Sequence, residues 1–371
     1  MKKKVLVGLS GGVDSAVSAY LLKEKGYDVT AGFMINYLAP EGEYCPTKDD
    51  LEEAKKVAKF LDIPFFTFDY REDYTAKVLD YMYEGYQKGI TPNPDIMCNS
   101  EVKFKVFLDE ALELGFDYIA MGHYAQIVKV GPHPNPLLQE REQGISSEGQ
   151  NYKYFLKKGV DENKDQSYFL AGLNQFQLSK ALFPIGHLQK SEVREIAEKI
   201  GLPNAKRKDS QGICFVGKVD LTKFLEKKIS PKPGLVKDTS GKTLGEHKGV
   251  FYYTIGQRKG LDIGGQGQPI FVVKKDIEKN EIIVGTSADL ELYSDYLELK
   301  NISFLTEELT LPFSGKAKIR YRQKDQKCIL DKNETGKYFV KFAENQRAIT
   351  SGQIFALYDE NDFLVASGVI D

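Results

Sequence analysis

The stretch Lys4-Val5-Leu6-Val7-Gly8-Leu9-Ser10-Gly11-Gly12-Val13-Asp14-Ser15 decides the fold of this chain. Its first half is a short apolar run, as in a buried strand, and its second half is rich in glycine. Residues 15–25 then carry apolar side chains at helical spacing before Gly26. A strand, a glycine turn and a helix in this order predict a unit whose turn aims backbone N–H groups at an anion.

The same alternation continues along the first half of the chain. We expect strands over 28–34, 65–68 and 118–122, and helices over 48–61 and 103–114. Strands that alternate with helices predict a doubly wound parallel α/β sheet, whose ligands lie beyond the carboxyl ends of the strands.

The second half of the chain has a different sequence pattern. From about residue 234, short strands separated by Gly, Asp and Asn turns predict a small β-rich middle domain and a C-terminal β-barrel. We place the domains at 1–207, 208–287 and 288–371. Residues 131–150 have three alternating prolines and no periodicity, so we expect a flexible insertion between two strands of the first domain.

Composition and charge exclude several classes of protein. The 371 residues are 42% hydrophobic with a net charge of −2, so general disorder is excluded and a polyanion must be met by a local basic patch. No apolar run approaches the roughly 18 residues of a membrane span, and the apolar stretch near residue 5 is too short for a secretory signal, so we expect a first strand there. The four cysteines form no CxxC pair, so we expect no protein metal site and a cytoplasmic location.

The glycine turn at residues 8–15 predicts a phosphate site. It lacks the Gly-Lys-Ser/Thr ending of a Walker loop and the glycine spacing of a dinucleotide fingerprint, so neither of those chemistries is indicated. The alternative is a strand-to-helix turn without a ligand.

Two cysteines have unusual neighbours. Cys98 follows a segment with two prolines, three residues after Asp95, and we expect it just before a helix that begins near Glu101. A helix N-terminus lowers the pKa of a thiol. Cys214 lies on a segment flanked by glycines, which permit close approach of another chain. For each cysteine the alternative is a buried structural role.

The turn Ser10-Gly11-Gly12-Val13-Asp14-Ser15 resembles the pyrophosphatase loop of enzymes that cleave ATP and adenylate a carbonyl oxygen. This resemblance implies that the doubly wound sheet is of the adenine nucleotide hydrolase-like kind. Five further motifs resemble, in order, those of the bacterial tRNA-specific 2-thiouridylase family, and the likeness covers nearly the whole chain. They are Thr91-Pro92-Asn93-Pro94-Asp95 with Cys98-Asn99, Gly122-His123-Tyr124-Ala125, the run from Lys164 to Leu170, Gly212-Ile213-Cys214-Phe215, and the run from Tyr253 to Leu261. The chain departs from the family in the 131–150 insertion and in Gln211, where Thr is usual.

The resemblance implies a reaction that replaces the 2-oxygen of the wobble uridine of tRNA by sulfur, using ATP with Mg²⁺. It implies that Cys214 carries a persulfide from a sulfur-relay protein or cysteine desulfurase, that Cys98 is the nucleophile, and that Asp95 is the general acid/base. The ATP site would comprise Gly8, Leu9, Ser10, Gly11, Gly12, Val13, Asp14, Ser15, Met34 and Gly122. The tRNA contacts would comprise Asn93, Pro94, Asp95, His123, Lys164, Asp165, Gln166, Arg320, Tyr321 and Gln353.

Two other functions compete with this one. An amidating or ligating synthetase would share the ATP loop but gives the two cysteines no role. A non-catalytic tRNA-binding or sulfur-carrier module would explain the β-rich half but leaves the loop unused.

A basic stretch suggests where tRNA binds. Residues 316–327 hold six basic residues and one acidic residue. If residues 316–324 form one strand, Lys316, Lys318 and Arg320 share a face with two further cations, while Tyr321 points to the other face. We therefore expect a basic patch, with a solvated barrel face as the alternative.

Overall fold

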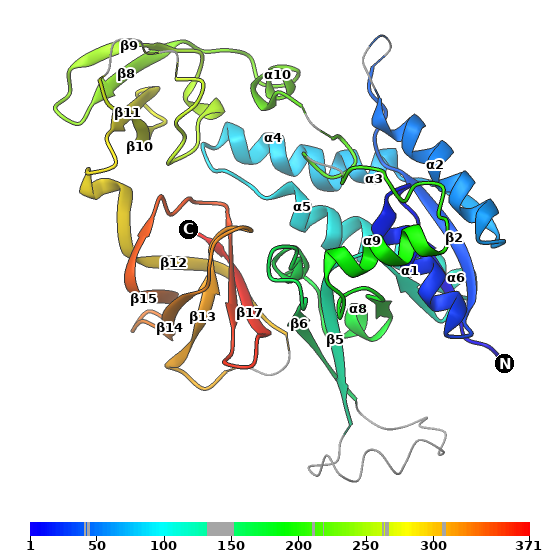
Figure 1. Ribbon diagram of the computed structural model, residues 1–371. Coiled ribbons are helices and arrows are strands. Elements are labelled where there is room, and N and C mark those ends of the chain that lie inside the picture. Colours follow the sequence, from blue (N-terminus) through cyan, green and yellow to red (C-terminus); the bar gives the residue numbers. More distant parts are fainter. Residues whose placement is uncertain are drawn as a thin grey trace.

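The computed structural model describes residues 1–40, 42, 45–131, 152–209, 212–217, 219–261, 263, 267–305 and 309–371. The expected insertion at 131–150 lies outside these residues except for Gly131, and so does Gln211. Figure 1 shows a parallel-sheet domain that carries the N-terminus, a barrel at the C-terminus and a smaller β-rich part between them in sequence. The boundaries that we placed after residues 207 and 287 stay predictions.

The first domain is built on a parallel sheet that begins with the strand quoted above. Its strand order is β3 (Phe65–Asp69), β2 (Asp28–Ile35), β1 (Lys4–Gly8), β4 (Tyr118–Ala120) and β7 (Ala181–Leu182). Four of the five β1 residues are buried, as expected for a central strand covered on both faces.

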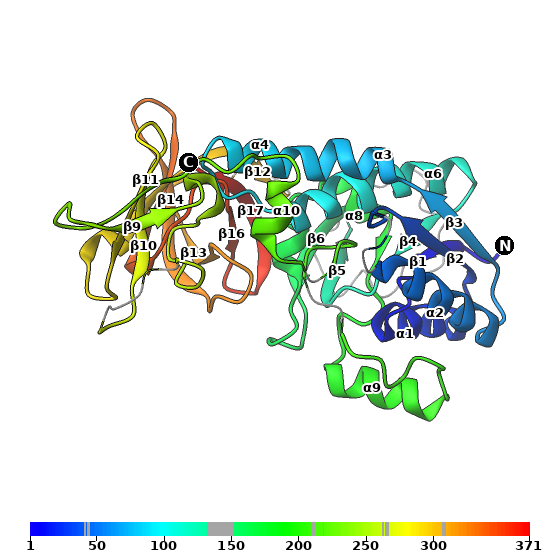
Figure 2. The ribbon, with the colours of Figure 1, turned by 90° about the horizontal axis from the view of Figure 1, so that it is seen from above.

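Helices cover both faces of this sheet. Val5 and Val7 pack with apolar residues of α1, α2 and α9, whereas Leu6 packs with residues of the segments from α3 to α6. Figure 2 shows these two groups on opposite sides of the sheet. The doubly wound fold is therefore confirmed. The helical segments are α1 (Val13–Glu24), α2 (Pro46–Phe60), α3 (Arg71–Tyr74), the π-helix η1 (Thr75–Leu79), α4 (Asp80–Gln87), α5 (Pro94–Met97), the π-helix η2 (Cys98–Val106), α6 (Phe107–Glu113), the 3₁₀ helix η3 (Ser167–Leu170), α8 (Gln175–Ser179) and α9 (Lys190–Lys199).

The helix expected over 103–114 starts earlier in the structure. Three segments, α5, η2 and α6, follow one another without a break from Pro94 to Glu113. Asn93 caps the first turn, because its side-chain oxygen accepts the Ile96 N–H at 3.2 Å. Proline is tolerated at the first helical position, so Pro94 begins the helix, while Pro92 lies just before it.

The middle part holds a mixed four-stranded sheet. Its order is β10 (Phe271–Asp276), β11 (Glu281–Gly285), β8 (Gly234–Asp238) and β9 (Thr243–His247). The β11–β8 pair is parallel and the other pairs are antiparallel. Around this sheet lie α10 (Leu221–Glu226) and the short 3₁₀ helices η4 (Val250–Tyr252) and η5 (Leu290–Leu292).

Six antiparallel strands form the C-terminal barrel. They follow the order β12, β15, β14, β13, β16 and β17, and pairing between β12 and β17 closes the sheet, which confirms the expected barrel. Their bounds are β12 (Tyr293–Phe304), β13 (Phe313–Lys318), β14 (Gln326–Lys332), β15 (Tyr338–Arg347), β16 (Ile354–Tyr358) and β17 (Phe363–Ile370).

The barrel is joined to the first domain by strand pairing. The hairpin β5 (Ala125–Val130) and β6 (Lys153–Lys158) extends from the first domain, and β6 pairs antiparallel with β17. Among the described residues, no helix is long and apolar enough to cross a membrane.

The basic strand expected over 316–324 is wrong beyond Lys318, where β13 ends. Lys318 is buried and lies 3.3 Å from the carboxylate of Asp165, which is itself buried, while Lys316 pairs with Asp362 at 2.9 Å near the surface. A cation buried in an ion pair is not available to a phosphate. Lys318 therefore ties the barrel to the first domain and does not belong to a basic patch.

We expect Lys318→Met to destabilise the protein, because it leaves the Asp165 carboxylate buried without its cation. The cost should be roughly 3 kcal/mol, reduced somewhat by the backbone N–H groups that Asp165 also accepts. Lys316→Met is the matched control, and loss of its exposed pair should cost less than about 1 kcal/mol. Calorimetric melting of both variants would contradict this role if the two shifts were equal.

Candidate active site

The phosphate loop follows β1 and ends at the N-terminus of α1. Gly11 has a φ of +75°, and a Cβ there would lie 2.4 Å from the Asp50 carbonyl oxygen, so only glycine fits. The Ser15 hydroxyl donates to the Gly12 carbonyl and accepts the Ser10 N–H, both at 3.1 Å. The turn is thus held in one shape, with the positive end of a twelve-residue helix beside it.

A network of charges surrounds this loop. Asp14 accepts the Tyr124 hydroxyl at 2.9 Å and the Lys190 ammonium at 2.7 Å. Lys190 also lies 2.8 Å from Asp209, which is bound by Lys164 as well. Burial alone would raise the pKa of Asp209, but the bonds from Lys164 and Lys190 lower it to about 2. These lysines are held in place next to a loop that suits an anion.

Gly8 and Gly122 allow close packing beside the loop. A Cβ on Gly8 would lie 2.5 Å from the Met121 sulfur, and a Cβ on Gly122 would lie 2.7 Å from the Ser15 nitrogen. Met34 lies across from Gly8, 3.3 Å from the same added atom. The loop, Met34 and Gly122 therefore meet at the carboxyl end of β1, and their role in holding a nucleotide stays a prediction.

The two cysteines singled out in the sequence come together. Cys98 begins η2 and is buried, and its thiol lies close enough to that of Cys214 for each to change the pKa of the other, without a covalent bond between them. Cys214 lies in a tight turn between Ile213 and Gly217, where Phe215 has a φ of +65°. Such a backbone conformation is unusual for a bulky residue and is typical of functional sites.

Two side chains of the first domain hold the Cys214 turn. Asp95 accepts the Cys214 backbone N–H at 3.0 Å, and the Tyr74 hydroxyl donates to the Cys214 carbonyl at 2.6 Å. Burial raises the pKa of Asp95, although the Cys214 N–H bond acts against this shift. A carboxyl group with a raised pKa suits a general acid or base.

The acidities of the two thiols differ in a way the sequence did not predict. The hydrogen bond from Cys98 and the nearby Lys103 ammonium lower the pKa of Cys214 to about 7, whereas burial raises that of Cys98 well above its usual range. The expected effect of a helix N-terminus on Cys98 is wrong, because the helix begins at Pro94 and Cys98 lies inside it.

Sequence reasoning missed Lys103. It lies five residues after Cys98. In an α-helix, this spacing places two side chains about 140° apart around the helix axis. In η2 the wider π-helical turn brings the two positions onto nearly the same face, so an α-helical pattern gives no signal for it.

Three consecutive residues contact both the phosphate loop and η2, the helix that carries Cys98. Gly122 packs on Ser15 of the loop, and Tyr124 donates to Asp14. His123, between them, is buried against Phe104 and Phe183, and burial together with Lys103 holds its pKa well below the usual range. A neutral, buried His123 is poorly placed for the predicted tRNA contact.

The other predicted tRNA residues make contacts within the protein. Asn93 and Pro94 begin α5, next to Asp95. Lys164 binds Asp209, Asp165 binds Lys318, and the Gln166 side-chain oxygen accepts the Tyr124 N–H at 3.0 Å.

The three predicted tRNA residues of the barrel also make contacts within the protein, and two of them contact the first domain. The Arg320 guanidinium donates to the backbone carbonyls of Arg347 and Ala348, and Tyr321 packs on Phe169 with ring centroids 4.2 Å apart. Gln353 donates to the Thr91 carbonyl at 2.8 Å, just before Asn93. Their contacts with tRNA stay predictions.

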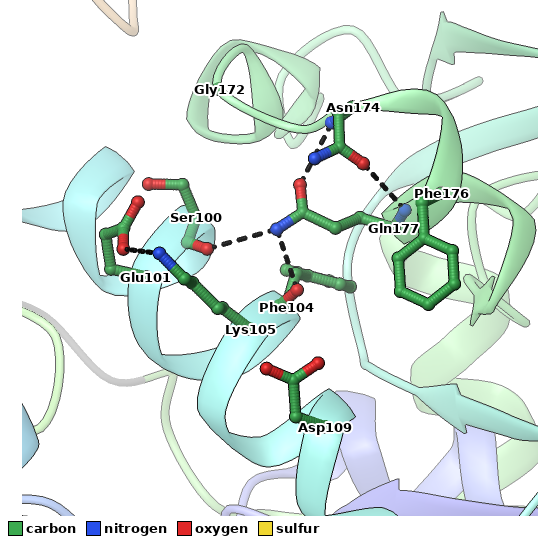
Figure 3. A pocket seen from close by; sticks show the side chains of 9 residues that line it. All are labelled: Ser100, Glu101, Phe104, Lys105, Asp109, Gly172, Asn174, Phe176 and Gln177. Carbon is green, nitrogen blue, oxygen red and sulfur yellow. Dashed lines mark hydrogen bonds and ion pairs between the residues drawn. The ribbon is translucent and has the colours of Figure 1, made fainter. Parts of the chain in front are cut away.

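A separate cavity of about 290 Å³ lies against other residues of η2. Figure 3 shows it between η2 and the start of α8, with the Glu101–Lys105 pair on one side and Phe176 on the other. Neither thiol lines it. The described residues also contain no group of three or more His, Cys, Asp or Glu side chains arranged for a metal ion.

Three family models match the chain in order. They are the tRNA methyl transferase HUP domain at residues 3–218, the tRNA methyl transferase PRC-barrel domain at 222–286 and the aminomethyltransferase beta-barrel domain at 294–370. With the phosphate loop and the parallel sheet, these matches define the class: an ATP-utilising enzyme of the HUP-domain kind.

Full-length relatives give the particular family. The tRNA-specific 2-thiouridylase MnmA of Shouchella clausii is 47% identical and covers 100% of this chain and 98% of its own. MnmA of Halalkalibacterium halodurans is 46% identical, with 99% and 94% covered. The chain belongs to the tRNA-specific 2-thiouridylase family. The solved U34-tRNA thiolase NcsA from Methanococcus maripaludis is 22% identical over 54% of this chain and 57% of that chain, with a TM-score of 0.33, too low to support an argument.

We expect Cys214 to react with iodoacetamide at neutral pH and Cys98 to be protected. The thiolate is the nucleophile, so alkylation of Cys214 should rise with pH to half its maximal rate near pH 7. Cys98, with its raised pKa and its burial, should react only at much higher pH. Mass spectrometry of both peptides between pH 6 and 9 measures this order, and faster reaction of Cys98 at pH 7 would contradict it.

Proposed function

We propose that the chain is a tRNA-uridine 2-sulfurtransferase that adenylates the 2-oxygen of the wobble uridine and then replaces it by sulfur. The observation that carries this proposal is the adjacent pair of Cys98 and Cys214, together with residues 122–124, which contact the phosphate loop on one side and η2, the helix of Cys98, on the other. Activation of a carbonyl oxygen needs the loop, and sulfur transfer needs the thiols. The chain thus offers groups for both parts of the reaction in its first domain and the turn packed against it.

The loop at residues 8–15 would hold the ATP phosphates. Backbone N–H groups at a helix N-terminus stabilise charge that develops on a phosphate. The 2-oxygen attacks the α-phosphorus, pyrophosphate leaves, and the base becomes an adenylate from which AMP departs. Mg²⁺ would bind mainly through phosphate oxygens and water, with Asp14 as the carboxylate that the loop itself offers.

The thiols would then supply sulfur. Cys214 receives sulfur as a persulfide, either from a sulfur-relay protein or from a cysteine desulfurase. In one route the outer persulfide sulfur attacks the adenylated carbon and expels AMP, and Cys98 then attacks the Cys214 sulfur, which breaks the S–S bond and releases the thiolated base. In the other route Cys98 attacks the Cys214 sulfur first and frees sulfide, which attacks the adenylated carbon and expels AMP. Either route leaves a Cys98–Cys214 disulfide that a thiol reductant of the cytoplasm must reopen. Asp95, beside both thiols, would carry the proton that this exchange moves.

The target base must leave the anticodon stack to reach this site. Asn93 and Pro94 begin the helix that carries Cys98, and Arg320, Tyr321 and Gln353 lie on the barrel side of the same region. We propose that the tRNA lies across this junction. The buried Lys318 is no part of the contact.

We expect Cys98→Ser and Cys214→Ser each to abolish 2-thiouridine while pyrophosphate release in the presence of tRNA stays within about twofold, because adenylation does not use the thiols. Cys45→Ser, a half-buried cysteine outside the pair, is the matched control. The measurements are mass spectrometry of nucleosides from tRNA and a pyrophosphate assay.

These measurements also separate the alternatives. A thiol variant with normal product would contradict the two-thiol reaction. Pyrophosphate release without tRNA would indicate a synthetase. The absence of pyrophosphate release even when tRNA is present would indicate a binding module. A methylated product, the reaction that the description of the family model names, would contradict sulfur transfer.

A further inference from the structure

Lys103 lies where the two thiols meet, and the reaction described above gives it no role. Its ammonium acts on Cys98, Cys214 and Asp95, and it lies 5.5 Å from the centre of the Phe215 ring, in the turn that carries Cys214. A lysine in such surroundings costs free energy unless a partner stabilises its charge. The partner on hand is the sulfur of Cys214.

We propose that Lys103 is a catalytic residue that holds the reactive sulfur of Cys214 as an anion, first as the thiolate that accepts sulfur and then as the persulfide that delivers it. This inference rests on the proposed function for its second half only. The first half concerns the free enzyme and holds whatever the substrate is.

The charges around Cys214 favour this role for Lys103. Asp95 faces the turn from α5 and would repel an anionic sulfur, and Cys98 remains a protonated donor. Tyr74 faces it from α3 with a neutral hydroxyl, because burial raises its pKa. His123, on which the Lys103 ammonium also acts, is kept neutral by burial and by that ammonium. Lys103 is therefore the positive charge that acts on this sulfur.

The shape of η2 places the lysine there. Its nine residues form a π-helix, and Phe104 departs from helical geometry with a φ of −101° and a ψ of 15°. The Gln177 side-chain amide donates to the Phe104 carbonyl at 2.8 Å and to the Ser100 carbonyl at 3.3 Å. Figure 3 shows these two bonds reaching from the start of α8 to η2. Gln177 thus supplies hydrogen bonds from outside the helix to two carbonyls of the distorted segment. An undistorted α-helix would not need them.

The sulfur-transfer step balances without an added oxidant. The Cys214 thiolate attacks the outer sulfur of a donor persulfide, one S–S bond forms, the donor S–S bond breaks, and the donor leaves as a thiolate. The new Cys214 perthiol loses its proton to become the nucleophile. An ammonium beside the Cys214 turn, 5.5 Å from the centre of the Phe215 ring, favours the anion before and after this exchange.

The test compares Lys103→Met with Lys105→Met in the full-length protein. Lys105 is exposed and pairs with Glu101 at 2.8 Å, so it controls for loss of a lysine from the same helix. With iodoacetamide as probe, Lys103→Met should slow alkylation of Cys214 at pH 7 by about tenfold and move the midpoint of its pH profile upward from about 7. Lys103→Arg should restore most of the rate, because the charge is retained.

The inference is overturned if Lys103→Met leaves the pH profile unchanged, or if Lys105→Met moves it equally. Should Lys103→Met fail to fold, Lys103→Gln offers the same loss of charge with a polar head group, and the same criterion applies. The alkylation assay contains neither ATP nor tRNA. The two failures can therefore be told apart. If only the proposed function is wrong, Lys103→Met still shifts the alkylation profile of Cys214, but the wild-type enzyme makes no thiolated tRNA.

Discussion

The hydrogen bond from the Cys214 backbone N–H to the Asp95 carboxylate holds the site together. It joins two segments 119 residues apart and sets one thiol against the other. Tyr74 adds a second bond to the same peptide segment, and the left-handed conformation of Phe215 persists because these contacts fix the turn on both sides. Without this attachment Cys98 would be an ordinary buried cysteine inside a helix.

The attachment also divides the work between the thiols. A buried thiol that donates a hydrogen bond keeps its proton, and the thiol that accepts the bond loses its own more easily. Cys214 is less buried than Cys98 and lies on a turn flanked by glycines, so under the proposed function it is the sulfur offered to a donor. Under that function Cys98, the more buried thiol, would resolve the persulfide without competing for the donor.

The other domains support the segment that precedes the helix of Cys98. The Thr91 backbone N–H donates to the Ser351 carbonyl at 2.9 Å, Gln353 donates to the Thr91 carbonyl, and the hydroxyls of Thr91 and Thr254 lie 3.2 Å apart. One turn of the first domain is therefore in contact with both the barrel and the middle part. This arrangement connects the surfaces predicted to meet tRNA with the residue that caps the helix.

The sequence by itself determined the doubly wound sheet, the barrel and the phosphate loop, because local periodicity and glycine spacing specify them. The family motifs also indicated Cys98, Cys214 and Asp95. Tertiary structure decided the rest. The acidity of each thiol depends on burial and on contacts across the fold, Lys103 reaches the sulfur because η2 is π-helical, and Lys318 is buried because Asp165 of another domain faces it. The pattern of residues along the sequence shows neither the charge of a side chain that is distant in sequence but near in space nor the burial of a side chain away from water. Those two quantities determine the pKa values at this site.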